Sequence, residues 1–272
     1  MNDGKAIIAR QEQEFNIRLL AAQRRLYSKA KKFKYLQIAL SIVPPVVVTF
    51  LQIAGIVTAD IVLFLAVEAA MMCGAAFCGR AAAKNRDCAA KVQQAFDSDV
   101  FGIPFGFASL RGIDVEKTAD VELGSRGDKD LINWYSCVRE DMRAGEAISA
   151  CQKMNCRWSK HLVMRYGAVS IGVPALAMTA VVLLILNLDV DAMTLVFLGA
   201  MPEWLFDRMI ATVECYSMYG SLEDDLGAYN LGQRENIIAV QDRVYELRRY
   251  DYQIPDWFYF RFRQNDEKAF SR

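Results

Sequence analysis

Histidine is nearly absent from this sequence, because His161 is the single histidine among 272 residues. The seven cysteines are scattered along the chain, and no two of them form a C-x-x-C pair. Zinc sites in proteins take their ligands mainly from closely spaced cysteine and histidine residues. We therefore expect no metal site. An odd number of separate thiols is typical of reduced cysteines that face a cytoplasm or lipid.

An excess of charge of either sign is also missing, because 32 basic residues balance 32 acidic ones. Proteins that bind nucleic acid through bulk electrostatics carry a clear basic excess. We therefore expect no DNA binding. The first 34 residues lack the short apolar core of a cleavable signal peptide, so the first membrane helix would itself have to direct insertion.

Recognisable catalytic spacing is missing as well. The sequence holds no nucleophile elbow, no metal-binding pattern and no paired catalytic residues at a familiar spacing. A Cys–His dyad through His161 is the one arrangement that the residue content still allows. We expect a protein that is not an enzyme and that needs no cofactor.

A long hydrophobic hairpin occupies residues 35–79. It consists of two apolar stretches of about 23 and 19 residues, each long enough for an α-helix to cross the hydrocarbon core of a bilayer. Only Thr58, Ala59 and Asp60 separate the two stretches. The hydrophobicity surrounds each helix instead of following one face, which favours a membrane hairpin over the buried hairpin of a soluble protein. Basic residues flank this block on both sides: Lys29, Lys31, Lys32, Lys34, Arg80, Lys84 and Arg86.

A second apolar block, residues 162–206, repeats this plan within a hairpin predicted over residues 162–213. A span over residues 166–188 leads into a short turn at residues 187–191, and a fourth span begins near Met193. This fourth span reaches only about 13 residues, because Pro202, Glu203, Asp207 and Arg208 then enter the pattern. Neither turn carries Lys or Arg, so the positive-inside rule places both termini and the central region in the cytoplasm.

These patterns together predict an all-α membrane protein with four transmembrane helices in two hairpins and long amphipathic cytoplasmic helices. Hydrophobic stripes predict such helices over residues 7–33, from Leu131 through Trp158, and over residues 233–250. We expect a cytoplasmic helix, a hairpin, cytoplasmic helices with a Gly/Pro-rich loop, a second hairpin, and a C-terminal helix with an aromatic tail, over residues 1–34, 35–79, 80–161, 162–213 and 214–272.

Charged residues inside the apolar blocks are the candidates for a pore or gate: Glu68, Glu203, Asp207 and Arg208. A carboxylate in hydrocarbon costs about 2.5–3.5 kcal/mol on insertion scales, so Glu68 should face protein or water. A water path and a protonated Glu68 hydrogen-bonded within the bundle both satisfy this requirement. Glu203, Asp207 and Arg208 allow two interpretations. They lie either in a kinked span that lines an aqueous cleft or at the end of a helix at the membrane interface.

A row of small side chains recurs every four residues in the second span: Ala66, Ala70, Gly74 and Cys78. Such rows let another helix approach closely in a membrane. Four helices from one chain pack too closely to enclose water, so a pore would need several copies. We therefore expect a homo-oligomer in which this row is a close helix contact.

Several short motifs lie in a defined order around the two hydrophobic blocks. They are Phe96-Asp97, Val100-Phe101-Gly102-Ile103-Pro104, Asn155-Cys156-Arg157-Trp158, Gln241-Asp242-Arg243-Val244-Tyr245 and Pro255-Asp256-Trp257-Phe258-Tyr259. In these motifs the chain resembles the SMODS-associated four-transmembrane effectors of bacterial CBASS-type anti-phage systems. The likeness covers nearly the whole sequence. The motif residues whose roles the sequence leaves open are Phe96, Asp97, Phe101, Pro104, Asn155, Trp158, Gln241, Pro255, Trp257 and Tyr259.

This resemblance implies a membrane-disrupting or pore-forming effector of the bacterial inner membrane that causes abortive infection. It also implies a neighbouring synthase whose cyclic oligonucleotide would be the ligand. Two other functions remain open on the residues themselves. One is a non-conducting membrane receptor or scaffold, whose amphipathic helices would bind a partner. The other is an enzyme embedded in the bilayer that acts on lipid, for which the sequence offers only His161 and separate thiols.

Overall fold

A computed structural model describes residues 1–56, 61–104, 114–120, 123, 130–186, 200–229 and 232–262. The regular structure within these ranges is helical, which confirms the all-α class. The labelled α-helices are α1 (Gly4–Gln11), α2 (Glu14–Ile53), α3 (Ile61–Phe101), α4 (Val115–Ala119), α5 (Ala144–Leu186), α7 (Ala200–Ala228) and α8 (Arg234–Arg249). Residues 256–262 are helical as well.

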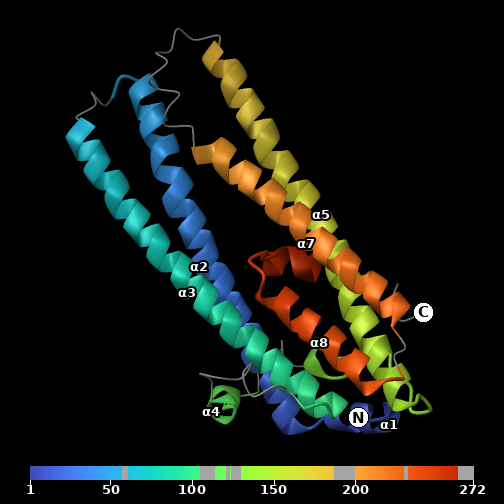
Figure 1. The fold of residues 1–272 in the computed structure, drawn as a ribbon. Helices are drawn as coiled ribbons and strands as arrows, with labels where there is room; N and C mark the ends of the chain where they lie inside the picture. The colour runs from blue at the N-terminus through green and yellow to red at the C-terminus, as the bar shows by residue number, and fades with distance from the viewer. Residues whose placement is uncertain are drawn as a thin grey trace.

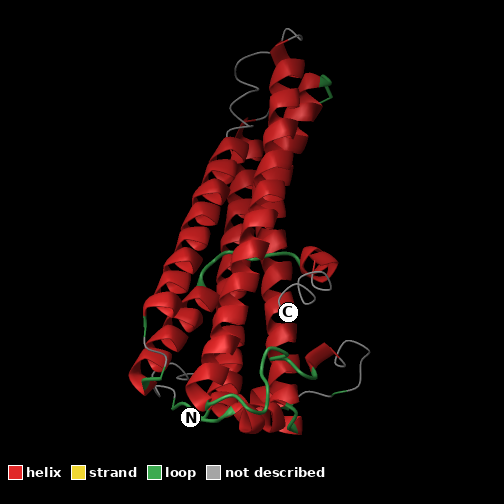
Figure 2. Cartoon of the chain, turned by 90° about the vertical axis from the view of Figure 1, so that its right-hand side faces the viewer, coloured by secondary structure: helices red, strands yellow, loops and turns green. Residues whose placement is uncertain are grey.

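The long helices form two pairs. Helix α2 packs along α3, and α5 packs along α7, so each pair is a helical hairpin (Figure 1). Helix α8 lies between the lower parts of the two pairs, and the segment that follows it lies above α8, between the pairs and farther from α1 and the N-terminus. Seen from the side, the long helices run along one common direction (Figure 2). The two hairpins are therefore joined mainly near the end of the bundle that carries the N-terminus.

The hydrophobic core is concentrated in the half of the bundle that carries the N-terminus, which we call the lower half. Ile7, Leu19, Phe96, Tyr135 and Ile148 are fully buried there, although they come from five different segments of the chain. A second cluster joins α5, α7 and α8 through Cys156, Leu222, Leu226, Val240 and Val244. Burying each large apolar side chain stabilises the fold by about 1.5–3 kcal/mol. The lower half is thus packed as a soluble helical domain is packed.

The upper half has the opposite character, because its apolar side chains point outwards. Large hydrophobic residues are exposed on all four long helices, among them Val43, Phe50, Met72, Phe77, Val173, Leu176, Phe206 and Val213. The exposed fraction reaches 73% at Leu176 and 69% at Met72. An apolar surface of this kind marks contact with a membrane or with another protein.

One stretch of the described residues, Ala144–Ala180 in α5, is long and apolar enough to cross a membrane by length and composition alone. The two turns predicted near residues 58–60 and 187–191 lie outside the described residues, and so does the predicted start of the fourth span. The arrangement of four spans in two transmembrane hairpins therefore stays a prediction.

The prediction of one unbroken helix from residue 7 into the first span is wrong. The helix is interrupted between α1 and α2. Near this interruption the Asn16 side chain donates hydrogen bonds to the Arg10 carbonyl (2.8 Å) and to Asp99 Oδ2 (2.8 Å). The Arg10 guanidinium also pairs with Asp99 Oδ1 at 2.9 Å. Because Asp99 near the C-terminal end of α3 binds both Arg10 and Asn16, α1 lies against that end of α3 and does not continue into α2 as one helix.

The prediction of a helix that starts at Leu131 is also wrong, since α5 begins only at Ala144. Leu131, Tyr135 and Val138 are buried as the stripe predicted, but they lie in a turn-rich segment. Helix α1 binds backbone groups of this segment that a helix would pair internally. Gln11 Oε1 accepts a hydrogen bond from the Tyr135 amide at 2.8 Å, and the Gly4 amide donates one to the Met142 carbonyl at 3.0 Å. The spacing located the core correctly but not the backbone conformation.

Other boundaries agree more closely with the sequence. The polar helix expected after the first hairpin forms the lower part of α3, and α8 matches the helix predicted over residues 233–250. Helix α3 ends at Phe101, and the next residue, Gly102, has a φ of 63° and an ideal Cβ position 2.8 Å from Asn2 Oδ1. Only glycine fits this position without strain or displacement of Asn2.

Candidate functional site

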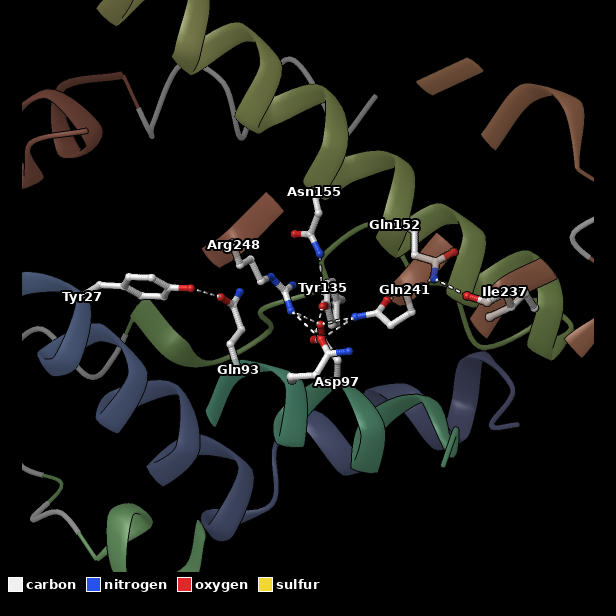
Figure 3. Close-up of polar contacts among 10 residues, drawn as sticks. Tyr27, Gln93, Asp97, Tyr135, Gln152, Asn155, Ile237, Gln241 and Arg248 are labelled. Carbon is white, nitrogen blue, oxygen red and sulfur yellow. Dashed lines mark hydrogen bonds and ion pairs between the residues drawn. The ribbon is translucent and has the colours of Figure 1, made fainter. Parts of the chain in front are cut away.

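Asp97 is the centre of a buried polar network (Figure 3). Its carboxylate lies in the lower part of α3, and its side chain has no exposed surface. It accepts hydrogen bonds from Tyr135 Oη at 2.5 Å, from Gln241 Nε2 at 2.8 Å and from Arg248 Nη1 at 2.6 Å. A single carboxylate therefore joins α3 to α8 and to the turn-rich segment before α5.

The network extends from Asp97 to the neighbouring helices. Gln94 Oε1 accepts from Gln241 at 3.2 Å and from Arg248 at 3.3 Å. Asn155 of α5 donates to Tyr135 Oη at 3.3 Å. Gln152, one turn earlier in α5, donates to Gln241 Oε1 and to the Ile237 carbonyl, both at 3.1 Å. Because these partners belong to α3, α5 and α8, the network fixes how the two hairpins sit on α8.

Burial and charge have opposing effects on this network. Burial alone would lower the pKa of Arg248, but the charge and hydrogen bond of Asp97, together with Tyr135 and Tyr27, outweigh it, and the pKa of the guanidinium is raised. Burial, with a contribution from Asp97, also raises the pKa of the Tyr135 hydroxyl. Arg248 therefore stays a cation and Tyr135 stays a hydrogen-bond donor at neutral pH. A buried ion pair of this kind is costly to break, because the remaining partner would be an uncompensated charge.

A cavity of about 780 Å³ lies beside the network, between the lower halves of both hairpins. Its walls come from α2, α3, α5, α7 and α8, from the turn-rich segment, and from residues 250–262. Four basic and two acidic side chains line it: Arg24, Lys31, Arg86, Arg248, Asp130 and Asp256. Aromatic rings form much of the remaining wall, including Tyr27, Trp134, Trp158, Tyr219 and Tyr259.

Residues 250–262, which we name the C-terminal strap, close one side of this cavity and bind the first hairpin. Asp251 pairs with Arg86 of α3 and, at 2.9 Å, with Lys34 of α2. Asp256 accepts from Lys31 at 2.6 Å and from Ser28 at 2.7 Å, both in α2. The strap is thus attached to the first hairpin by acidic side chains that meet basic ones.

The strap is attached to the second hairpin by aromatic side chains. The Arg208 guanidinium of α7 lies 4.1 Å from the centre of the Tyr252 ring and 4.8 Å from that of Tyr166 in α5. Tyr252 also shares a hydrogen bond with Thr212, at 3.2 Å. Phe258 is buried, with its ring centroid 5.1 Å from that of Tyr166. One short segment therefore links both hairpins directly.

Most of the ten motif residues of the sequence analysis lie together in this region. Asp97, Asn155 and Gln241 are members of the polar network. Phe96 and Phe101 pack on the Tyr135 ring, with centroids 6.0 and 5.3 Å away. Trp158 stacks on Tyr259 at 5.7 Å in the cavity wall. The other three are Pro255, which is buried in the strap, and Pro104 and Trp257, which are exposed.

The candidate pore or gating residues lie on α3 and α7, and one of them, Arg208, contacts the strap. Glu68 is half-buried, and its Oε1 has no hydrogen-bond partner among the described residues. Glu203 and Asp207 are exposed on α7. Arg208 lies against Tyr166 and Tyr252 and donates to Ser170 at 3.3 Å. The structure thus places Arg208 at the joint between α5, α7 and the strap.

The small-residue row faces two directions. A Cβ at Gly74 would lie 3.3 Å from Leu40 Cδ1 of α2, and Cys78 is buried. Ala66 and Ala70 are exposed. Gly74 thus provides a close contact inside the first hairpin, whereas Ala66 and Ala70 leave a small-residue surface open to another helix.

Sequence reasoning missed several residues of this site, chiefly Arg248, Tyr135 and the residues of the strap that bind the hairpins. Arg248 had a usable signal, because it follows Gln241 by seven residues and so lies on the buried face of α8. A charged residue on a buried stripe needs a buried partner. Among the described residues, no group of three His, Cys, Asp or Glu side chains is placed to hold a metal ion.

Residues 5–204 match the model of the SMODS-associating 4TM effector domain. This chain belongs to that family. The resemblance seen in the sequence motifs is thereby confirmed, and the protein is a membrane effector associated with CBASS-type defence. No curated protein and no solved structure matches the chain. The matched residues include Asp97 and Asn155, whereas α8 and the strap, which complete the network and the cavity, lie beyond them.

Proposed function

We propose that this effector permeabilises the bacterial inner membrane as a homo-oligomer when a cyclic oligonucleotide signals infection, and that the leak arrests the infected cell. Membership of the family supports a membrane effector of CBASS-type defence. The finer steps rest on the distribution of polarity along the bundle.

The observation that carries the proposal is the contrast between the two halves. The upper half exposes large apolar side chains on α2, α3, α5 and α7, and the lower half buries a charged network and a polar cavity. Leaving such apolar side chains in water would forfeit about 1.5–3 kcal/mol each, which a bilayer restores. Lys31, Lys34 and Arg86 lie below the apolar half, as the positive-inside rule expects of a cytoplasmic end.

The packing of the first hairpin supports the proposal of a homo-oligomer. Gly74 of α3 touches Leu40 of α2, and a Cβ at Gly79 would meet the Gln37 side chain at 3.0 Å. Two helices this close leave no water path between them. A conducting wall would therefore need helices from several copies, and Ala66 and Ala70 offer an exposed surface for such a contact.

We further propose that the protein acts without catalysis. Cys156 is the cysteine in the cavity wall, and burial, with the nearby Glu223 carboxylate, raises its pKa to about 12. A thiol with such a pKa is almost entirely protonated at neutral pH and is a poor nucleophile. His161 is exposed on α5 and is not part of the wall.

Dye release from liposomes tests the proposal directly. Purified full-length protein is reconstituted in vesicles of bacterial phospholipid, and leakage is followed with and without cyclic oligonucleotides. Leakage that depends on the nucleotide, with a matching rise in oligomer size, is the expected result. Nucleotide binding without leakage would favour the non-conducting receptor. Lysophospholipid or free fatty acid, detected by mass spectrometry, would favour the lipid-acting enzyme.

A further inference from the structure

We propose that the cavity between the hairpins is the site at which the protein binds an anionic ligand that carries a nucleobase, and that this ligand is a cyclic oligonucleotide. The inference rests on the proposed function, because it assigns the place and chemistry of the signal. Its support comes from the volume of the cavity, from unsatisfied polar atoms in its wall, and from the charged and aromatic side chains around it.

The size and position of the cavity fit a small-molecule site. Ligand pockets in proteins commonly measure about 300–1,000 Å³, and this one measures about 780 Å³. It lies among the lower halves of α2, α3, α5 and α7, at the end of the bundle where Lys31 and Arg86 lie. A soluble ligand on the cytoplasmic side therefore reaches it without entering the bilayer.

Three side chains of the wall hold buried polar atoms that have no hydrogen-bond partner among the described residues. They are Trp134 Nε1, Arg248 Nη2, and both Nε2 and Oε1 of Gln253. The Arg248 side chain is only 9% exposed. Buried polar groups are normally satisfied, and each exception requires an explanation. A bound ligand that supplies acceptors to Trp134 and Arg248 explains them together, because the three residues belong to one cavity.

Gln253 indicates what the ligand presents. Its amide offers one donor and one acceptor side by side, and neither is used within the described part of the chain. A nucleobase edge carries a donor and an acceptor at the matching separation, which is why glutamine reads bases in pairs of hydrogen bonds. Either orientation of the amide serves, because both of its polar atoms lack partners.

Aromatic side chains supply the stacking surface that bases need. Tyr27 of α2, Trp158 of α5 and Tyr259 of the strap all line the cavity. Bases stack on such rings without regard to sequence, and these contacts contribute strongly to binding of single-stranded nucleotides. Burial raises the pKa of Tyr27, so its ring carries a neutral hydroxyl at neutral pH.

The charges of the wall suit phosphate groups, since Arg24, Lys31, Arg86 and Arg248 outnumber Asp130 and Asp256. Arginine binds phosphate oxygens through paired charge-assisted hydrogen bonds. Lys31 and Arg86 are engaged with Asp256 and Asp251 of the strap. A phosphate that enters the cavity therefore competes with the strap for the same cations, which connects ligand binding to the joint between the hairpins.

Binding to the intact protein tests this inference. Full-length protein in detergent micelles is equilibrated with labelled cyclic di-AMP, cyclic GMP–AMP and cyclic tri-adenylate. Unlabelled pyrophosphate, ribose 5-phosphate and inositol trisphosphate serve as competitors that carry phosphate without a base. We expect at least one cyclic oligonucleotide to bind and these competitors to displace it weakly. Displacement by inositol trisphosphate as effective as by the unlabelled nucleotide would identify a lipid-headgroup site and overturn the assignment.

Substitutions locate the site. Trp134→Phe removes the indole donor but keeps a ring, and Gln253→Leu removes both amide atoms at similar volume. Each should weaken binding by roughly tenfold, the factor that corresponds to one hydrogen bond of about 1.4 kcal/mol. Arg24→Gln should do the same. The matched controls are Trp257→Phe, on an exposed strap residue, and Arg25→Gln, on the exposed neighbour of Arg24; both should bind within twofold of wild type.

Thermal unfolding in the same micelles shows whether each variant folds. If the folded cavity variants all keep wild-type affinity, or if none of the cyclic oligonucleotides binds wild-type protein, the inference is wrong. The liposome experiment gives a separate answer. Binding that depends on the cavity, without leakage, would retain this site and reject permeabilisation, whereas nucleotide-triggered leakage unaffected by the cavity variants would retain permeabilisation and reject this site.

Discussion

Asp97 of α3 and Arg248 of α8 form an ion pair of 2.6 Å between Oδ2 and Nη1, although 151 positions separate them in the sequence. The carboxylate is completely buried and the guanidinium almost so. The pair lies where α8 meets the first hairpin, and through Tyr135 and Asn155 it also reaches the second. The joint between the hairpins therefore depends on a contact that local sequence does not specify.

Breaking this pair should destabilise the fold. Arg248→Met leaves Asp97 buried without its cation, and we expect a loss of about 3–5 kcal/mol. The double variant Asp97→Asn/Arg248→Met should recover part of this loss, because no charge then remains buried. Thermal unfolding in detergent measures both. An unchanged midpoint in Arg248→Met would show that the pair contributes nothing to stability.

The attachment of the strap should respond to acid. Burial alone would raise the pKa of Asp251, but the hydrogen bond and charge of Lys34, with the charge of Arg86, hold it below its ordinary value of 3.8. Because the folded pKa is the lower one, the pairs contribute stability above pH 3.8 and lose it as the pH falls through the folded pKa. Unfolding midpoints from pH 7 to pH 2.5 should therefore stay level and then decline.

Asp251→Asn isolates this contribution. The variant should unfold at a lower temperature at pH 7 and decline less in acid than wild type. The effect should be about 1 kcal/mol or less, because partly exposed ion pairs are screened by solvent. Identical pH profiles for the variant and wild type would show that Asp251 does not contribute to the pH dependence of unfolding.

Glu68→Gln separates a pore residue from a structural one. If Glu68 lines a water path, removing its charge should lower cation conductance while membrane insertion and abundance stay unchanged. If its role is a hydrogen bond inside the bundle, Gln should substitute well and Leu should reduce stability. Planar-bilayer conductance and membrane abundance measure the two effects. Wild-type behaviour of Glu68→Leu in both would exclude both roles.

Gly74→Leu should disturb the first hairpin. Its Cβ would stand 3.3 Å from Leu40, and the rest of the side chain would force α2 and α3 apart, at a cost of about 1–3 kcal/mol. Gly172→Leu is the matched control, since nothing lies within 4 Å of a Cβ at that helical glycine. The unfolding midpoint and the oligomer size in detergent are the readouts. Equal loss in both variants would show a general cost of leucine and not a packing contact.

Topology can be tested with reporters. A fusion after Arg272 should be active only in the cytoplasm, and a tag inserted at Asn187 should be reached only from the opposite side of the membrane. The expectation comes from the absence of Lys and Arg in the two predicted turns and from the basic residues at the lower end of the bundle. A periplasmic C-terminal reporter would contradict the four-span arrangement.

The candidate site could be predicted only in part. The motifs that contain Asp97, Asn155 and Gln241 pointed to residues that share one network, but gave them no role. Arg248 was recognisable only as a polar residue on an otherwise buried helix face. Tyr135 was expected on a helix, and it entered the network because Gln11 binds its backbone amide and fixes a turn there. Gln253 and Tyr252 carried no local signal, because their function depends on neighbours from distant helices.

By itself, the sequence determined the helical class, the two apolar blocks, the amphipathic face of α8 and the family. These features follow from the spacing of residues that are close along the chain, because helix periodicity and hydrophobic length act locally. Only the tertiary structure decided that Asp97 would meet Arg248, that the strap would join both hairpins, and that a cavity would remain between them. Such contacts are made when α8 and the strap pack between helices far apart in sequence, and side-chain partners are selected by that packing.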